Sequence, residues 1–184
     1  MRIISGQFKG QLLVSFNASH IRPTTDRVKG SLFNKLQDRT VGATVLDLFC
    51  GTGSLGLEAL SREAKNCTFV DDNKKSLQIT SQNIEKLKLP KSVARLVHKD
   101  VIEFLKSYKG DPFDLIFVDP PFTEKMAHLV MLALQNSAVF GPQSLISIES
   151  GHKEPILDEY KTLFRFDKRD FGDKVLSLFS QKES

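Results

Sequence analysis

The strongest chemical signal in this 184-residue chain is the tetrapeptide Asp-Pro-Pro-Phe, which directly follows an apolar run at residues 113–118. The lone pair of an exocyclic amine on a nucleic-acid base is delocalised into the ring. A site that alkylates this nitrogen must therefore hold it in place and use hydrogen bonds to favour a more pyramidal geometry. A carboxylate and a proline carbonyl can accept the two N–H bonds of such an amine, and a phenyl ring can stack on the base. The spacing predicts methyl transfer to an exocyclic amine, with these catalytic residues: Asp119, Pro120, Pro121 and Phe122.

This chemistry needs no covalent bond between enzyme and substrate. A methyltransferase that attacks carbon five of a pyrimidine would need a nucleophilic cysteine beside the prolines, and neither Cys50 nor Cys67 is near them in the sequence. The alternative is that the tetrapeptide has only a structural role. In that case the two prolines simply end a strand, since proline has no N–H to donate to a neighbouring strand.

A glycine-rich segment, DLFCGTGSLG, occupies residues 47–56. Gly51, Gly53 and Gly56 match the pattern G-x-G-x-x-G, in which a strand turns tightly into a helix and bare backbone can approach a ligand. Asp71 follows Gly51 by twenty residues, and its carboxylate can accept hydrogen bonds from both hydroxyls of a ribose. These features suit S-adenosylmethionine and NAD equally.

Two further aspartates favour S-adenosylmethionine. Asp47 precedes the glycines, where it can face the amino group of a ligand or order the loop, and where it would repel a pyrophosphate. Asp100 can accept a hydrogen bond from an adenine amino group, with Val101 in apolar contact with the ring. Open α/β sheets bind ligands at the edge where these strands end. The predicted cofactor-binding residues are Asp47, Phe49, Gly51, Thr52, Gly53, Gly56, Asp71, Asp100 and Val101.

The elements that must position these residues alternate between strands and helices from residue 43 onward, which predicts a doubly wound α/β sheet. Strands are expected at residues 44–49, 67–70, 94–97, 113–118, 145–148, 164–166 and 175–179, and helices at residues 54–62, 74–87, 102–107 and 126–134. The last two strands are joined by a short link with Gly172, too short for a parallel crossover of about a dozen residues. A Rossmann-like, mostly parallel sheet with an antiparallel last strand is therefore predicted.

The first 40 residues carry the positive charge of the chain. They hold seven Lys and Arg against two Asp, a net charge of +5, whereas the other 144 residues hold 19 basic and 20 acidic side chains. Residues 2–15 suggest a small hairpin, and a helix is expected to begin at residues 22–26. The helix residues expected to face the core are Val28, Leu32, Phe33 and Leu36. This segment suits phosphate binding, and an ordinary solvated face is the alternative.

Length and composition predict one compact unit, with residues 1–40 as an N-terminal extension and residues 41–184 as the catalytic domain. No apolar run is long enough to span a bilayer, and the first residues lack the pattern of a signal peptide, so we expect a cytoplasmic protein. The two cysteines are expected to be reduced core residues. The four histidines lack metal-ligand spacing, so no metal is predicted.

Three segments, in order and spacing, resemble a known family. They are RPTTDRV at residues 22–28, DLFCGTGSLGLEALSR at residues 47–62 and DPPF at residues 119–122. Together they are similar to the RsmD-type 16S rRNA guanine-N2 methyltransferases, and the likeness extends from residues 2–6 to residues 171–173. The resemblance implies a seven-stranded class I methyltransferase fold, S-adenosylmethionine as cofactor, and a guanine of small-subunit ribosomal RNA as target.

The resemblance also implies a role for each matching position. The glycine loop and Asp71 would bind the cofactor, Asp100 its adenine, and residues 119–122 the target guanine. Residues 22–28 would line the site, and the N-terminal hairpin and helix would grip RNA. The implied RNA-binding residues are Arg2, Lys9, Arg22, Thr24, Thr25 and Arg27. Lys29-Gly30 departs from the basic and acidic pair usual in the family, and a glycine weakens a helix by about 1 kcal/mol, which puts the local helix geometry in question.

Other functions fit parts of the pattern. An adenine-N6 DNA methyltransferase would also use an Asp-Pro-Pro-aromatic motif, but it usually needs a separate target-recognition region, for which this chain has no room. An NAD-dependent oxidoreductase leaves the double proline unexplained, and a noncatalytic RNA-binding module needs only the basic N-terminal segment. The partner expected from the resemblance is 16S rRNA, free or within an assembling small subunit, bound by a monomer without metal or membrane.

Overall fold

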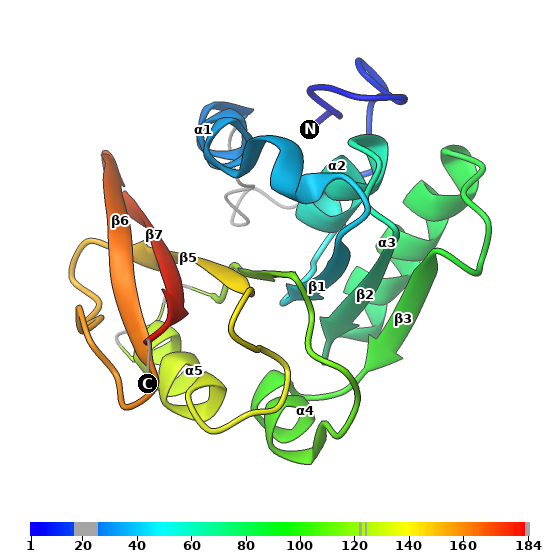
Figure 1. Cartoon of the computed structure of the whole chain (residues 1–184). Helices are drawn as coiled ribbons and strands as arrows, with labels where there is room; N and C mark the ends of the chain where they lie inside the picture. The colour runs from blue at the N-terminus through cyan, green and yellow to red at the C-terminus, as the bar shows by residue number, and fades with distance from the viewer. Residues whose placement is uncertain (17–25, 122, 124, 183–184) are drawn as a thin grey trace.

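The structure is a computed structural model that describes residues 1–16, 26–121, 123 and 125–182. A seven-stranded sheet runs through the molecule, with helices on both of its faces (Figure 1). The elements are, in chain order, α1 (Asp26–Leu36), a 3-10 helix (Gln37–Thr40), β1 (Thr44–Leu48), α2 (Ser54–Ser61), β2 (Asn66–Asp71), α3 (Lys74–Lys86), β3 (Ala94–His98), α4 (Val101–Ser107), β4 (Leu115–Val118), α5 (Met126–Leu134), β5 (Leu145–Gly151), β6 (Leu163–Phe171) and β7 (Lys174–Gln181).

The strand order of the sheet is β3-β2-β1-β4-β5-β7-β6. Strands β1 to β5 pair in parallel, whereas β7 is antiparallel to both β5 and β6. Gly172 turns β6 into β7 with a left-handed φ of 71°. The predicted parallel sheet with an antiparallel last strand is confirmed. Its order reverses between β1 and β4, and ligands of open α/β sheets bind at such a switch point.

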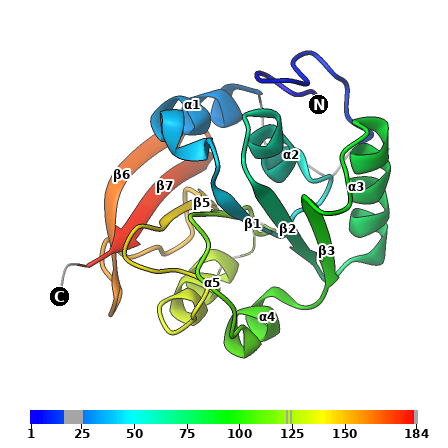
Figure 2. The ribbon, with the colours of Figure 1, turned by 45° about the vertical axis from the view of Figure 1, so that its right-hand side comes forward.

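Helices α1, α2 and α3 cover one face of the sheet, and α4 and α5 cover the other (Figure 2). An apolar core lies on each face, between the sheet and its helices. Because successive residues of a strand point to opposite faces, Val45 packs into the first core and Leu46 into the second. Phe33 of α1 meets Phe117 of β4 edge-on, with ring centroids 5.6 Å apart, so the expected inward face of α1 is confirmed.

Each strand and helix expected from residue 44 onward is present, and the differences lie at the ends. β5 continues three residues past the expected end at residue 148, and β6 spans nine residues where three were expected. β6 lies at the edge of the sheet, and most of its residues after Phe164 are partly or fully exposed. An edge strand can carry charged residues, and because these interrupt the apolar pattern, the sequence predicted a shorter strand.

The expected N-terminal hairpin is present and packs on α2. The amide of Ile3 donates to the carbonyl of Gln11 at 2.9 Å, and Glu58 of α2 accepts hydrogen bonds from two amides of the hairpin. Gly6 has a φ of 83°, and a Cβ there would lie 1.9 Å from the carbonyl oxygen of Ser61. Only glycine permits this approach of the hairpin to α2.

Helix α1 continues through Gly30, so the departure from the family pattern does not interrupt it. Lys29 is fully buried. Its Nζ donates to the carbonyl of Arg2 at 2.7 Å and to Ser54 Oγ at 3.0 Å, and lies 3.3 Å from a carboxylate oxygen of Glu58. Burial lowers the pKa of Lys29, and Glu58 opposes that shift. Lys29 thus joins α1 and the hairpin to the first residue of α2.

Both cysteines are free and buried, as expected of core residues. Burial raises the pKa of each thiol well above its usual range, which makes the reactive thiolate rare. Across residues 1–16, 26–121, 123 and 125–182, no group of three or more His, Cys, Asp and Glu is placed to hold a metal ion. No helix in that part of the chain is long and apolar enough to cross a membrane.

Candidate active site

The glycine turn between β1 and α2 is left-handed at three positions. Phe49, Gly51 and Gly53 have φ values of 58°, 56° and 77°. The amide of Gly53 donates to the carbonyl of Cys50 at 2.7 Å and closes the turn. A phenylalanine in this region is strained, and such strain concentrates at functional sites. The glycines leave this turn without side chains at two positions, so a ligand can approach its backbone closely.

The side chain of Asp47 stabilises this turn by a hydrogen bond. Its carboxylate is buried and accepts the amide hydrogen of Gly56 at 2.9 Å, the loop-ordering role that the sequence left as one of two options. Burial raises the pKa of Asp47 well above its usual range, the Gly56 bond opposes that shift, and the charges of Asp119 and Asp71 add to it. A Cβ at Gly56 would lie 2.4 Å from the ring of Phe69, so this glycine serves the packing of α2 on β2.

Asp71 ends β2 beside the turn. Its two carboxylate oxygens accept the amide hydrogens of Gly51 and Asn73, both at 2.9 Å. Burial raises the pKa of Asp71, whereas these two amide bonds oppose the shift. The structure thus brings together two of the predicted cofactor residues, Gly51 and Asp71, by a direct hydrogen bond.

Three other predicted cofactor residues make contacts of their own. Asp100 is the N-cap of α4 and accepts the amide hydrogen of Glu103 at 2.9 Å. Val101 is 2% exposed and packs in the core under the sheet, so its contact with a ring stays a prediction. Thr52 is buried, and its hydroxyl lies 3.2 Å from the sulfur of Met1.

The tetrapeptide begins directly after β4, next to the glycine turn. β1 and β4 are neighbours with Leu48 opposite Val118, and the amide of Asp119 donates to the carbonyl of Leu48 at 3.4 Å. Pro120 is buried and Pro121 is exposed. Phe122 lies outside the described residues, so its stacking role stays a prediction.

Three of the predicted RNA-binding residues are exposed in the N-terminal part of the chain. Arg2 lies 2.9 Å from a carboxylate oxygen of Asp26, and Lys9 is exposed on the hairpin. The guanidinium of Arg27 lies over the ring of Phe171, 5.9 Å from its centroid, a contact that no local pattern indicated. The predictions that lie outside the described residues are Arg22, Thr24 and Thr25.

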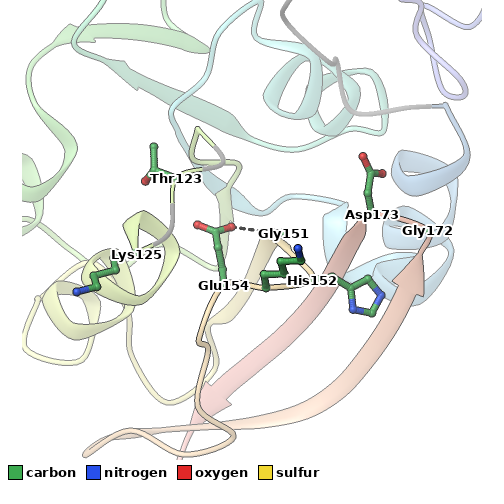
Figure 3. A pocket seen from close by; sticks show the side chains of 8 residues that line it. Thr123, Lys125, Gly151, His152, Glu154, Gly172 and Asp173 are labelled. Atoms are coloured by element: carbon green, nitrogen blue, oxygen red, sulfur yellow. Dashed lines mark hydrogen bonds between the residues drawn. The ribbon is translucent and has the colours of Figure 1, made fainter.

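A pocket of about 610 Å³ opens at the same edge of the sheet (Figure 3). It lies between the segment before α5, the end of β5 and the turn from β6 to β7. Its lining residues are Thr123, Lys125, Gly151, His152, Lys153, Glu154, Gly172 and Asp173. None of these residues was predicted as part of a site, because they come from three distant segments of the sequence. The two glycines, each beside a strand end, were the one local signal.

Comparison with known proteins identifies relatives along the chain. The model of the family described as conserved hypothetical protein 95 matches residues 1–180. Ribosomal RNA small subunit methyltransferase D of Haemophilus influenzae is 37% identical over 158 residues, which cover 85% of this chain and 82% of that protein. The protein of the same name from Escherichia coli strain K12 is 39% identical over 150 residues, 82% of this chain and 74% of that protein.

A solved structure agrees with these matches over the whole fold. The Escherichia coli protein yhhF has a TM-score of 0.87 to this chain at 33% identity, and the match covers 99% of this chain and 98% of that one. The family indicated by the three sequence segments and the expected methyltransferase fold are both confirmed. The chain therefore belongs to the family described as conserved hypothetical protein 95, and its relatives include RsmD-type methyltransferases.

Proposed function

We propose that this protein transfers the methyl group of S-adenosylmethionine to the N2 amino group of a guanine in small-subunit ribosomal RNA. One observation carries the proposal. The glycine turn, with Asp71 bonded to it, and the Asp119-Pro120 segment follow neighbouring strands. A methyl donor at the turn and an amine at the tetrapeptide would meet at this edge of the sheet.

The electrostatics of the turn favour S-adenosylmethionine over NAD. The charges of Asp119 and Asp71 reach Asp47 and help to raise its pKa, after burial as the main cause. Negative potential at this edge attracts a sulfonium cation and repels a pyrophosphate. When bound, S-adenosylmethionine supplies a methyl group that the positive charge on sulfur activates for displacement.

The residues around the turn have the donors and acceptors to hold this cofactor. Each carboxylate oxygen has about two acceptor sites, so Asp71 can accept ribose hydroxyls in addition to its two amide bonds. Asp100 uses one oxygen to cap α4, and its second oxygen would accept the adenine amine. Asp47 and Gly56 keep the turn in shape, while Gly51, Thr52 and Gly53 would present backbone to the ligand.

Catalysis in this proposal is mainly positioning. Asp119 and the carbonyl of Pro120 accept the two N–H bonds of the guanine amine and direct its lone pair at the methyl carbon. A carbon–nitrogen bond would form as the carbon–sulfur bond breaks, and the Asp119 carboxylate would accept the proton that the nitrogen then loses. Phe122 would stack on the base.

The N-terminal extension, residues 1–40, would bind the RNA backbone, and residues 41–184 would carry the reaction. Exposed Arg2, Lys9 and Arg27 support this division, because phosphate contacts are electrostatic and independent of sequence. The two relatives named as ribosomal RNA small subunit methyltransferases support 16S rRNA as the substrate. We infer that a monomer acts on this RNA in the cytoplasm.

The test is direct. Ribosomal RNA from a strain that lacks this protein is incubated with the purified chain and S-adenosylmethionine, then digested, and its nucleosides are separated. We expect one new N2-methylguanosine, mapped to the small-subunit RNA. Methylated adenine in DNA instead would establish the adenine-N6 alternative, and binding of NAD without S-adenosylmethionine in calorimetry would contradict the proposal.

A further inference from the structure

Glu154 has an unusual environment in the pocket at the end of β5. Its Oε2 accepts the amide hydrogen of Gly151 at 2.6 Å, and its own amide donates to the carbonyl of Gly151 at 3.0 Å, so the side chain is fixed on its turn. Its Oε1 is buried and has no hydrogen-bond partner among the described residues. A buried acceptor without a donor is costly, and native proteins rarely keep one without a reason.

The second oxygen is directed toward the segment before α5. In Figure 3 the Glu154 carboxylate lies among the lining residues, with one oxygen bonded to Gly151 and the other on the side that Thr123 and Lys125 line. The amide of Thr123 donates to the carbonyl of Pro121 at 2.8 Å. The acceptor therefore faces the segment that continues from the tetrapeptide.

The strand pairing places Gly151, to which Glu154 is hydrogen-bonded, near Asp119. β4 and β5 are neighbours with Val118 opposite Ile148. Asp119 and Gly151 follow this pair by one and three residues, so their Cα atoms are about 8 Å apart for a strand spacing of ~4.8 Å and a rise of ~3.3 Å per residue. A glutamate side chain can cross part of that distance, and a purine held by Asp119 can fill the rest.

Selection of guanine needs a group that Asp119 and Pro120 do not supply. Two acceptors for an exocyclic amine serve guanine N2 and adenine N6 equally well. The ring nitrogen N1 beside that amine differs, because it carries a hydrogen in guanine and a bare lone pair in adenine. An acceptor aimed at N1 therefore accepts a guanine hydrogen and repels adenine, and unpaired buried polar groups discriminate strongly.

We propose that Glu154 Oε1 accepts the N1–H of the target guanine and so makes the site specific for guanine over adenine. This inference rests on the proposed function and adds its specificity residue. Glu149, which lies within β5, does not suit the role, because its carboxylate forms a salt bridge with Lys174 at 2.9 Å. Glu154 offers the acceptor that the chemistry requires, in a pocket that Thr123, two residues after Pro121, also lines.

The test replaces this hydrogen-bond acceptor with a donor. In Glu154→Gln the amide oxygen keeps the bond from Gly151, so the amide nitrogen takes the place of Oε1 and donates. Wild-type and variant protein are assayed on the mapped RNA target with guanine or with 2-aminopurine, which keeps the N2 amine but has a bare N1. We expect the wild type to prefer guanine by roughly 10- to 100-fold in kcat/KM, and the variant to lose or invert that preference.

The controls separate specificity from structure. The dissociation constant of S-adenosylmethionine and the melting temperature should not change in Glu154→Gln, and exposed Glu85→Gln on α3 should keep the wild-type preference. An unchanged ratio of guanine to 2-aminopurine in Glu154→Gln, or equal losses on both substrates, overturns the inference alone. A wild-type protein that methylates no guanine overturns the proposed function as well.

Discussion

Asp119 is the residue on which the proposed reaction depends most. Its backbone is tied to β1 beside the glycine turn, and its carboxylate would accept an N–H bond of the target amine. We expect Asp119→Ala to lower kcat by roughly 10²- to 10³-fold, the usual effect of removing one preorganised hydrogen-bonding group from an active site. Transfer of a labelled methyl group to RNA measures this. Cofactor affinity should stay within a few-fold, and exposed Asp111→Ala should behave as wild type. Loss of cofactor binding would move Asp119 into the cofactor site.

Asp71 gives a complementary test of the cofactor site. Asp71→Asn keeps one acceptor for the two amides but removes the charge that would hold the ribose hydroxyls. We expect S-adenosylmethionine to bind more weakly by about 1.5–3 kcal/mol, the range for a hydrogen bond to a charged group. Isothermal titration calorimetry measures the change. An unaltered dissociation constant would count against the ribose contact.

Asp47 makes stability depend on pH. Burial raises its pKa in the folded protein, whereas in the unfolded chain an aspartate titrates near about 3.9. Above that pH the folded state binds more protons at this group than the unfolded state, so this carboxyl lowers the free energy of unfolding as pH rises. Asp47→Asn removes the titration and can still accept from Gly56. The stability of the variant relative to wild type should therefore increase from about pH 4 upward, as measured by urea denaturation. A difference that is flat or falls with pH would show that the pKa is not raised.

At the scale of elements, α1 connects the two ends of the chain. Lys29 joins it to the hairpin and α2, while Arg27 lies over Phe171 and Lys35 pairs with Asp167 at 3.1 Å, both on β6. Helix α1 is therefore anchored to the hairpin and α2 at one place and to the edge strand β6 at another.

The Lys29 contact is the stronger of these anchors because it is buried. Lys29→Met removes the buried cation beside Glu58, which keeps its salt bridge to Arg62, and we expect the free energy of unfolding to fall by about 3 kcal/mol. Lys35→Met, which breaks the half-exposed pair with Asp167, should cost only about 0–1 kcal/mol. Urea denaturation of both variants makes the comparison, and the double variant Lys29→Met, Glu58→Gln should recover part of the loss. Equal effects at the two lysines would mean that the buried pair does not anchor α1.

At the scale of the whole molecule, charge is segregated. The first 40 residues have a net charge of +5 and the rest of the chain is close to neutral, so RNA should approach from one side. Replacing three exposed residues of the extension by alanine should weaken RNA binding and reduce the slope of log affinity against log salt by about 0.7 to 0.9 for each phosphate group that is no longer neutralised. The three residues are Arg2, Lys9 and Arg27. Binding titrations at several salt concentrations measure the slope.

A matched variant tests whether position matters more than charge. It replaces three exposed lysines of the body, Lys65, Lys86 and Lys106, and removes the same charge. We expect its salt slope to stay close to that of wild type. The same reduction in both triple variants would mean that no particular face binds RNA.

Much of the fold was predictable because its signals are local. The apolar run before Gly51 and the proline pair after Val118 mark strand ends, and α5 begins and ends at the residues that periodicity indicated. β6 was underestimated because residues such as Asp167 and Lys168 interrupt the apolar alternation on an edge strand. Predictions at Arg22, Thr24, Thr25 and Phe122 lie outside the described residues and stay predictions.

The sequence by itself determined the order of the elements and the edge of the sheet that carries the glycine turn and the tetrapeptide. It also determined that the positive charge lies in the N-terminal segment. Each follows from residues close together along the chain. Only the tertiary structure decided that Lys29 is buried against Glu58, which of its two possible roles Asp47 takes, and that Glu154 keeps a buried oxygen without a hydrogen-bond partner among the described residues. Burial depends on segments that are distant in sequence, and folding alone brings those segments together.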